Sequence, residues 1–493
     1  MYNSITDFAQ NGLSIIEKNV EGCLKGYEDF SGLSQVIHDQ INQMELNLIA
    51  EIYELLDTEI RESIVRKKNW SIEQKSKEKS IEDIAGTVRF KRTGYVDKRT
   101  GKYVYLLDKI LGFDPHQKLT LAAAAKVLEE AIDSSYRKGG EAVNDHNAVD
   151  KMTVLRLVHD TEIETPIRAS KEKKKQKYLH IVADEDHVAL QFNRSKGDLK
   201  RDVNGNKINT VMPKLICLFE DIVDDAPEKS IRHRYRLVGK HYFSNTKTGP
   251  AANHNMWKEV DEYIFANYDT EYLQRIYIAG DGAPWIKSGV EILGAKSRFY
   301  LDKFHMMQYV NRSTTHLLDS TEDVKAEIWR CLNGGHKEEL RDIYKRILAV
   351  TEKESKYNEV RDALTYFLNQ WDGIMCRVEE AAGCWKCCAE GQISHVYSKR
   401  LSRNPMGWSK HGCEQMAKLR VFKQNGGQVI DLLKYQERIK QRQNREEHEA
   451  LIRDVRRNHS AAVYEERIRG SIPGMEMHSM KWLKDIVNGV FTA

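Results

Sequence analysis

Residues 275–282, Arg-Ile-Tyr-Ile-Ala-Gly-Asp-Gly, decide how the centre of this 493-residue chain folds. The apolar run predicts a short buried strand, and the glycines that flank Asp281 let the backbone turn sharply where the strand ends. Pro284 follows, and proline suits the first turn of a helix. Because the free N–H groups of a helix start favour anions, we expect Asp281 at a site that a phosphate can approach, although aspartate also caps helices for its own reasons.

Residues 178–184 repeat this pattern, since an apolar run again ends in a carboxylate, Asp184. Residues two apart in a strand share a face, so Asp184 and Asp186 are expected to point the same way. Either carboxylate could bind a hard cation such as Mg²⁺, and an acid in a turn between strands is the alternative. Further strands are expected over 187–192, 211–219 and 231–242, with a hairpin turn at Asn204-Gly205.

A third carboxylate, Glu390, stands near the start of residues 389–395, Ala-Glu-Gly-Gln-Ile-Ser-His, which have helical potential. A basic run and a Pro-Met-Gly-Trp turn at 405–408 follow. Three acids on separate elements can converge on two divalent cations, which is the apparatus for cutting and rejoining phosphodiesters. Asp302 and His305 are expected to share a helix face, where they could orient DNA or an acid, or form a structural pair.

The distribution of charge says more than its sum. The formal net charge of +4 is only weakly basic and does not by itself indicate nucleic acid. Basic residues gather over 168–177, 229–241 and 399–423, where they could neutralise phosphates or form solvated surface. Three short helices are expected over 118–162, and their arrangement resembles a helix-turn-helix, although many such units bind no DNA. The candidate DNA contacts are Lys151, Thr153, Arg156, Lys399, Arg400 and Arg403.

Several other classes of protein lack support in the sequence. No run of about 18 apolar residues predicts a membrane span, and the N-terminus lacks the pattern of a secretory signal. Eight cysteines in a chain of this length fit a reducing cytosol. Cys384, Cys387 and Cys388 lack the second ligand pair that a zinc site usually needs, so free thiols are favoured. No glycine loop of the kind that binds ATP or NAD is present.

The order of these elements predicts an α+β protein with an α/β core. Apolar residues recur at helical spacing between Ile41 and Leu56, which indicates a helical packing or dimerisation arm. Strands over 87–92 and 102–107 are expected to form a hairpin. We expect a helical region over 1–80, the hairpin and helix-turn-helix-like unit over 81–170, the first part of the core over 171–311, a helical insertion over 312–385, the last part of the core over 386–430 and a charged helical tail over 431–493.

Taken together, these segments resemble the ISLre-type transposases of bacterial insertion sequences, a family similar to the Mutator-like DDE transposases. The resemblance covers nearly the whole chain and is most specific at residues 183–188, 280–283, 301–305, 390–395 and 407–409. It implies an RNase H-like catalytic core with an all-helical insertion before the last acid. It also implies that Asp184, Asp281 and Glu390 are the catalytic, metal-binding triad, with Asp186 as the rival of Asp184.

The resemblance extends to residues near the triad and to partners. Asp302 and His305 would match a Cys/Asp-x-x-His element of the wider group, and together with His395 they could orient DNA or the acids. Two Mg²⁺ or Mn²⁺ ions would support cleavage and transfer of double-stranded DNA, both element terminal repeats and target. A homodimer or larger assembly in the bacterial cytoplasm, associated with the nucleoid and not with a membrane, is expected. Two alternatives stay open, a non-catalytic DNA-binding derivative and an RNase H-like metal-dependent nuclease.

Overall fold

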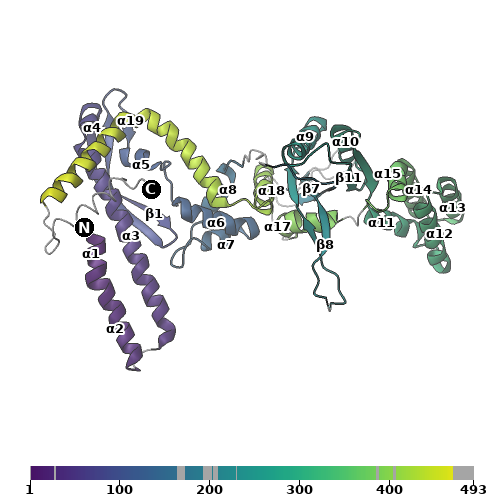
Figure 1. The fold of residues 1–493 in the computed structure, drawn as a ribbon, viewed down its shortest axis with the longest axis horizontal. Coiled ribbons are helices and arrows are strands. Elements are labelled where there is room, and N and C mark those ends of the chain that lie inside the picture. Colours follow the sequence, from purple (N-terminus) through teal and green to yellow (C-terminus); the bar gives the residue numbers. More distant parts are fainter. Residues whose placement is uncertain are drawn as a thin grey trace. The chain divides into compact units, whose positions relative to one another are not determined.

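Figure 1 shows the computed structural model, which describes residues 2–26, 29–163, 172–191, 203, 209–228, 230–384, 388–403 and 407–469. The chain forms two compact units. Unit 1 comprises Met1–Val127, Glu141–Val149 and Leu433–Ala493, and unit 2 comprises Leu128–Gly140 and Asp150–Leu432. Within the described ranges, no helix is long and apolar enough to cross a membrane.

Unit 1 begins with helices and continues into a three-stranded antiparallel sheet with the order β1-β2-β3. The helical elements are α1 (Asn3–Asp7), a π-helical turn (Phe8–Gly12), α2 (Leu13–Leu24), α3 (Phe30–Glu62), α4 (Ile64–Asn69) and α5 (Leu106–Leu111). The strands are β1 (Trp70–Asp83), β2 (Gly86–Asp97) and β3 (Tyr103–Val104).

The prediction of helix up to residue 80 is wrong, because residues from Trp70 onward pair with β2. The stretch 73–80 is polar and shows no apolar alternation, so its own sequence does not reveal a strand. Its pairing with β2 is a tertiary feature, and Ile81, the residue directly after it, is buried in the core. The predicted hairpin of β2 and β3 is present, but its second strand ends at Val104 because the chain then turns into helix α5.

The core of unit 1 joins segments from both ends of the chain. Helix α3 and the long helix α19 (Val429–Arg469) contribute to one apolar cluster that includes Ile60, Phe90 and Leu451. In the same core, Ser63 Oγ donates a hydrogen bond of 2.6 Å to Asp454 Oδ2. The predicted helical tail is therefore present up to residue 469, and the break expected near Gly470 and Pro473 lies outside the described residues.

The three helices expected over residues 118–162 are present as α6 (Leu121–Asp133), α7 (Tyr136–Glu141) and α8 (Lys151–Asp160). Asp150 caps α8, because its side chain accepts a 2.9 Å hydrogen bond from the Met152 N–H. Val154 and Val158 form the buried face of α8.

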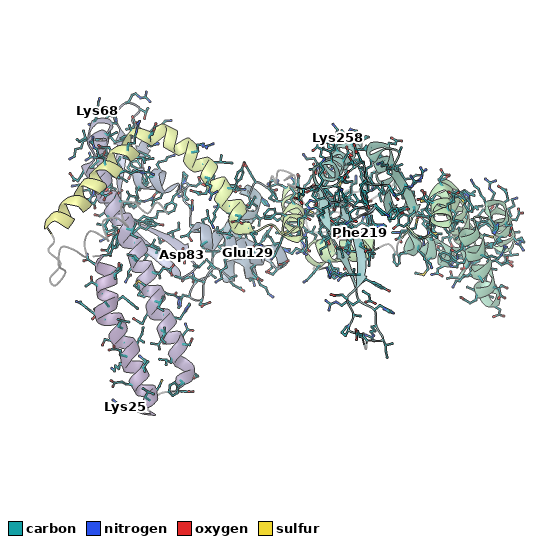
Figure 2. The ribbon with its side chains drawn as sticks, in the orientation of Figure 1. Lys25, Lys68, Asp83, Glu129, Phe219 and Lys258 are labelled. Carbon is teal, nitrogen blue, oxygen red and sulfur yellow. The ribbon has the colours of Figure 1, made fainter. Side chains whose placement is uncertain are left out.

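Unit 2 is built on a five-stranded mixed sheet with the order β10-β7-β4-β11-β12. Strands β4, β11 and β12 are parallel, whereas β7 is antiparallel to both of its neighbours. Figure 2 labels Phe219, the last residue of β7, among the side chains of this sheet. The sheet strands are β4 (Tyr178–Glu185), β7 (Lys214–Phe219), β10 (His241–Asn245), β11 (Arg275–Gly280) and β12 (Ser297–Leu301).

Short strand pairs and two helices accompany the sheet. The helices α9 (Pro250–Asn267) and α10 (Pro284–Leu293) pack on it through Trp257 and Ile286, and Pro284 opens α10 as expected. Helix α9 and strand β12 were not predicted, because neither has a strong periodic pattern. The turn expected at Asn204-Gly205 lies outside the described residues. The short pairs are β5 (Val188–Ala189) with β6 (Thr210–Val211), and β8 (Asp221–Asp224) with β9 (Tyr235–Val238).

The segment after β12 is helical, as predicted, and has an apolar cluster of its own around Leu332, Tyr344 and Phe367. Its helices are α11 (Lys303–Thr314), a 3₁₀ turn (Leu318–Ser320), α12 (Thr321–Gly334), α13 (Lys337–Val350), α14 (Glu354–Asn369) and α15 (Trp371–Glu379). The chain then forms α16 (Ala389–Ile393), a π-helical turn (Ser394–Ser398), α17 (Lys399–Leu401) and α18 (Lys410–Gln424). Helices and a mixed sheet confirm the predicted α+β class.

Candidate active site

Three neighbouring parallel strands deliver carboxylates to one edge of the sheet in unit 2. Asp184 is the next-to-last residue of β4, Asp281 directly follows β11, and Asp302 directly follows β12. The register pairs Val182 with Ala279 and Gly280 with Leu301. Because parallel strands end at the same edge, these three acids lie side by side there.

The charges at this edge act on one another. Burial raises the pKa of Asp184 to about 7, and the negative charges of Asp281 and Glu390 add to this, while the Glu185 N–H and His305 oppose it. Asp184 therefore lies within electrostatic reach of both other acids of the predicted triad. The structure therefore places Asp281 and Glu390 near enough for their charges to act on Asp184, although the three acids stand on three separate elements.

Close packing holds Asp281 at the end of its strand. Its Oδ1 accepts a 2.8 Å hydrogen bond from the Ala283 N–H, and its main-chain oxygen accepts one of 2.7 Å from the Tyr366 hydroxyl. Gly282 has a φ of +91°, and a Cβ there would lie 2.4 Å from Gln370 Cδ. The glycine is therefore required by the backbone conformation, and a Cβ there would also displace the Gln370 side chain between α14 and α15.

Asp302 and His305 form the pair that the sequence predicts, and they join the same cluster. Asp302 caps helix α11 by accepting a 3.1 Å hydrogen bond from the Phe304 N–H, and His305 Nδ1 lies 3.1 Å from Asp302 Oδ2. That hydrogen bond is the main cause of a raised pKa for His305, and the charges of Asp184 and Asp281 act in the same direction. His305 is thus more readily protonated than a free imidazole, and it lies close to the acids.

Glu390 is built into the site in another way. It is exposed on the five-residue helix α16, and its neighbour Gln392 accepts a 2.6 Å hydrogen bond from the hydroxyl of Tyr242 on β10. In the π-helical turn that follows, the Tyr397 hydroxyl contacts Ser244 Oγ at 2.6 Å and the main-chain oxygen of Lys214 at 3.0 Å. Side chains of β10 and the π-turn, together with a main-chain oxygen of β7, therefore hold the segment that carries Glu390, and such π-turns are frequent at functional sites.

The rival first acid, Asp186, has a different environment. Strand β4 ends at Glu185, and Asp186 accepts hydrogen bonds from Ser402 Oγ, the shorter of 2.9 Å, and from its neighbour's N–H. Glu185, which the sequence does not predict as a site residue, has a pKa raised chiefly by burial and also by the charge of Asp281. Its position directly after Asp184 is the only signal for it in the sequence.

A model of the uncharacterised protein family UPF0236 matches residues 24–439. The chain belongs to this family. A UPF0236 protein of Caldanaerobacter subterraneus subsp. tengcongensis is 35% identical over 433 residues, which are 88% of this chain and 82% of the relative. A second UPF0236 protein of that organism is 35% identical over 429 residues, which are 86% of each of the two chains.

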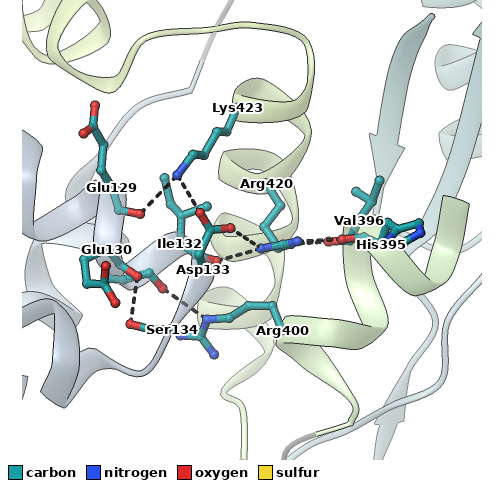
Figure 3. A network of polar contacts seen from close by, with 11 residues as sticks. Glu129, Glu130, Ile132, Asp133, Ser134, His395, Val396, Arg400, Arg420 and Lys423 are labelled. Carbon is teal, nitrogen blue, oxygen red and sulfur yellow. Dashed lines mark hydrogen bonds and ion pairs between the residues drawn. The ribbon is translucent and has the colours of Figure 1, made fainter. Parts of the chain in front are cut away.

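The predicted DNA contacts of this UPF0236 member fall into two groups. Most are at the surface, but Arg400 is only 2% exposed, and its Nε donates a 3.1 Å hydrogen bond to the main-chain oxygen of Ala131 (Figure 3). Its guanidinium lies 4.8 Å from the ring centre of Trp408. Arg400 is therefore a packing residue, and its prediction as a DNA contact is corrected because an aromatic side chain and a helix end enclose it. The exposed residues are Lys151, Arg156, Lys399 and Arg403, and Thr153 is half-buried.

His395, the third residue predicted beside the triad, is exposed, and its main-chain oxygen accepts a 2.7 Å hydrogen bond from Arg420. In the thiol cluster, Cys384 Sγ lies 4.0 Å from Cys376 Sγ, and Cys387 lies outside the described residues, as do Pro405 and Met406 of the expected turn. The sequence signal for Cys376 was weak, because it stands eight residues before the cluster.

Oxygen ligands dominate the candidate site of the UPF0236 member. Among the described residues, no group of three or more His, Cys, Asp or Glu side chains lies in an arrangement that would hold a metal ion. The donor chemistry nevertheless fits a hard divalent cation, since Asp184, Asp281 and Glu390 are carboxylates. Burial is the main cause of the raised pKa of Asp184, and a bound cation would oppose both the burial effect and the added charges of Asp281 and Glu390.

Proposed function

We propose that this protein is a DDE-type DNA transposase, which binds the terminal repeats of an insertion sequence and catalyses metal-dependent DNA strand cleavage and strand transfer. One observation carries the proposal. Asp184, Asp281 and Glu390 stand on a strand end, a turn and a short helix, and the charges of Asp281 and Glu390 both act on Asp184. Carboxylates gathered in this way suit the divalent cations that phosphoryl transfer uses.

The surrounding fold supports an RNase H-like core. The mixed sheet carries the first two acids, and the helices from α11 to α15 separate it from Glu390 along the chain. A helical insertion before the last acid is what the resemblance to ISLre-type transposases implies. The relatives add a second line of support. The name of one of them joins eleven numbered designations, all from one organism. A gene present in many copies is expected of a mobile element.

In this proposal each residue has a task. Mg²⁺ or Mn²⁺, with two ions expected, would activate the attacking oxygen and stabilise the leaving oxygen. Asp184, Asp281 and Glu390 would hold the metal, and His305, oriented by Asp302, would balance their charge. Exposed Lys399 would neutralise phosphates of the bound strand.

The partner is double-stranded DNA, both the element's terminal repeats and its target. Helices α7 and α8 would act as the helix-turn-helix, with the exposed residues Lys151 and Arg156 toward the DNA. Because two element ends must be held together, we propose a homodimer or larger assembly on DNA, associated with the bacterial nucleoid.

The test uses purified full-length protein, Mg²⁺ or Mn²⁺, and DNA that carries the sequences flanking the gene. We expect cleavage and joining at the element ends in the wild type and loss of both in Asp281→Asn, since the amide removes a metal-binding charge. Asp342→Asn is the matched control, because Asp342 is an exposed acid on helix α13 paired with Lys345. Full activity of Asp281→Asn would refute the proposal.

The products separate the alternatives. Cleavage without joining would indicate a metal-dependent nuclease with the same core. End-specific binding without any chemistry would indicate a non-catalytic DNA-binding derivative, a reading favoured only by the lack of a ready-made metal-ligand group among the described side chains.

A further inference from the structure

Helix α18 contacts two kinds of segment, the helices proposed to bind DNA and the turn that follows Glu390. Near its start, Gln415 Nε2 donates hydrogen bonds to the main-chain oxygens of His159 at 3.0 Å and Thr161 at 3.1 Å, at the end of helix α8. Near its end, α18 carries Arg420, which reaches both the end of helix α6 and the π-turn after Glu390. One helix therefore touches the proposed DNA-binding helices and the segment that carries the third acid.

Arg420 makes these contacts with a buried guanidinium (Figure 3). Nη2 donates to the main-chain oxygen of His395 at 2.7 Å, and Nε donates to that of Val396. On the opposite side, Nη1 donates to the main-chain oxygen of Ile132 and to Asp133 Oδ1, each at 2.9 Å. A single planar group thus bridges two main-chain segments.

The bridge has a physical reason on each side. The last carbonyls of a helix have no partner within the helix and form the negative end of its dipole, so a cation stabilises the end of α6. His395 and Val396 lie in the π-turn little more than one helical turn beyond Glu390. Arginine presents five donors in a fixed plane, whereas the three donors of a lysine ammonium share one nitrogen. A lysine therefore keeps the charge but does not reproduce the planar fork that reaches both segments.

We infer that Arg420 is a positioning residue for Glu390, and that it transmits the docking of helices α6 to α8 on DNA to this acid. The inference rests on the proposed function. In the proposed function, Arg420 touches neither the substrate nor the metal. Its donors hold the π-turn, the π-turn continues from α16, and α16 carries Glu390. When DNA orders α6 to α8, the same guanidinium orders the turn beside the acid.

The experiment compares the full-length wild type, Arg420→Lys and Asp133→Asn by hydrogen–deuterium exchange. In Arg420→Lys we expect the amides over residues 390–403 to exchange about tenfold faster, as for the loss of a charge-assisted hydrogen bond. Strand β11 should keep its wild-type exchange. Asp133→Asn is the control, because it removes the ion pair on the α6 side and leaves the bonds to His395 and Val396 in place.

DNA and activity measurements complete the test. A duplex with the sequences flanking the gene should slow exchange over residues 390–403 in the wild type and not in Arg420→Lys. Single-turnover cleavage by Arg420→Lys should fall about 100-fold, the scale expected of a misplaced catalytic group, with an unchanged Kd for DNA and a higher Mg²⁺ requirement.

Three results would overturn the inference. The first is an amide exchange rate over residues 390–403 of Arg420→Lys that equals that of the wild type. The second is an equal increase of the exchange rate in β11 of Arg420→Lys, which would mean a general loosening of the fold. The third is the same increase over residues 390–403 in Asp133→Asn. Unchanged exchange of the wild type on DNA would overturn the transmission from α6 to α8. A wild type that cleaves no DNA would refute the proposed transposase, whereas the exchange data without DNA would still decide whether Arg420 positions the π-turn.

Discussion

Asp184 and Asp281 come from the ends of neighbouring buried strands, whereas Glu390 comes from an exposed five-residue helix. On the strand edge, main-chain pairing and close packing determine where the acids lie. Around the helix, side chains from distant elements, among them Tyr242 and Arg420, hold the segment that carries Glu390 through hydrogen bonds. The difference suggests that the strand edge is the rigid half of the site and that α16 with its π-turn is the adjustable half.

The largest expected effect contrasts two glycines, one in each half. A Cβ at Gly280 would lie 2.7 Å from Ile286 Cδ1 and 3.0 Å from the main-chain oxygen of Ala183, whereas a Cβ at Gly391 would meet nothing within 4 Å. We expect Gly280→Ala to lower the free energy of unfolding by about 1–3 kcal/mol through overpacking. Gly391→Ala should raise it by about 0.5–1 kcal/mol, because alanine favours a helix. Urea unfolding measures both, and equal effects would contradict the contrast.

A second prediction concerns pH. The pKa of Asp184 is raised from 3.8 to about 7, so between these values the folded protein keeps a proton that the unfolded chain has released. The free energy of unfolding should therefore fall as the pH rises through this range. In Asp184→Asn the side chain is neutral at every pH, so the contribution of Asp184 to this fall should be absent. The melting temperature with EDTA, measured between about pH 4 and about pH 8, tests this.

Above about pH 7 the variant should be the more stable protein, and Mg²⁺ should raise the melting temperature of the wild type more than that of Asp184→Asn. Parallel melting curves for the two proteins would show that Asp184 is not the group responsible.

The smallest effects compare two tyrosine hydroxyls. Tyr366 bonds to the main-chain oxygen of Asp281, and Tyr242 bonds to Gln392 beside Glu390. Removing either hydroxyl by a change to Phe should cost about 1 kcal/mol of unfolding free energy. If α16 is the adjustable half, Tyr242→Phe should also raise the Mg²⁺ concentration for half-maximal cleavage, and Tyr366→Phe should not. The same Mg²⁺ dependence in both variants would remove the distinction.

Parts of the fold and of the site could be predicted from the sequence. The strands that end at Asp184 and Asp281 are buried, so they had to be apolar, and their pattern is local. The helices of the insertion likewise carry their periodicity in themselves. By contrast, β1 has a polar middle for which the sequence predicts helix, and its pairing with β2 is what makes it a strand.

The sequence by itself determined the α+β class, the two acids at strand ends and the pairing of Asp302 with His305, because each depends on residues close together in the chain. Only the tertiary structure decided that Glu390 lies within reach of Asp184, that Arg400 is buried and that Arg420 joins two main-chain segments. These features depend on contacts between residues far apart in the chain, as between Arg420 and Ile132, which are 288 positions apart. Such contacts form only when burial in one core brings distant segments together, and no local pattern records them.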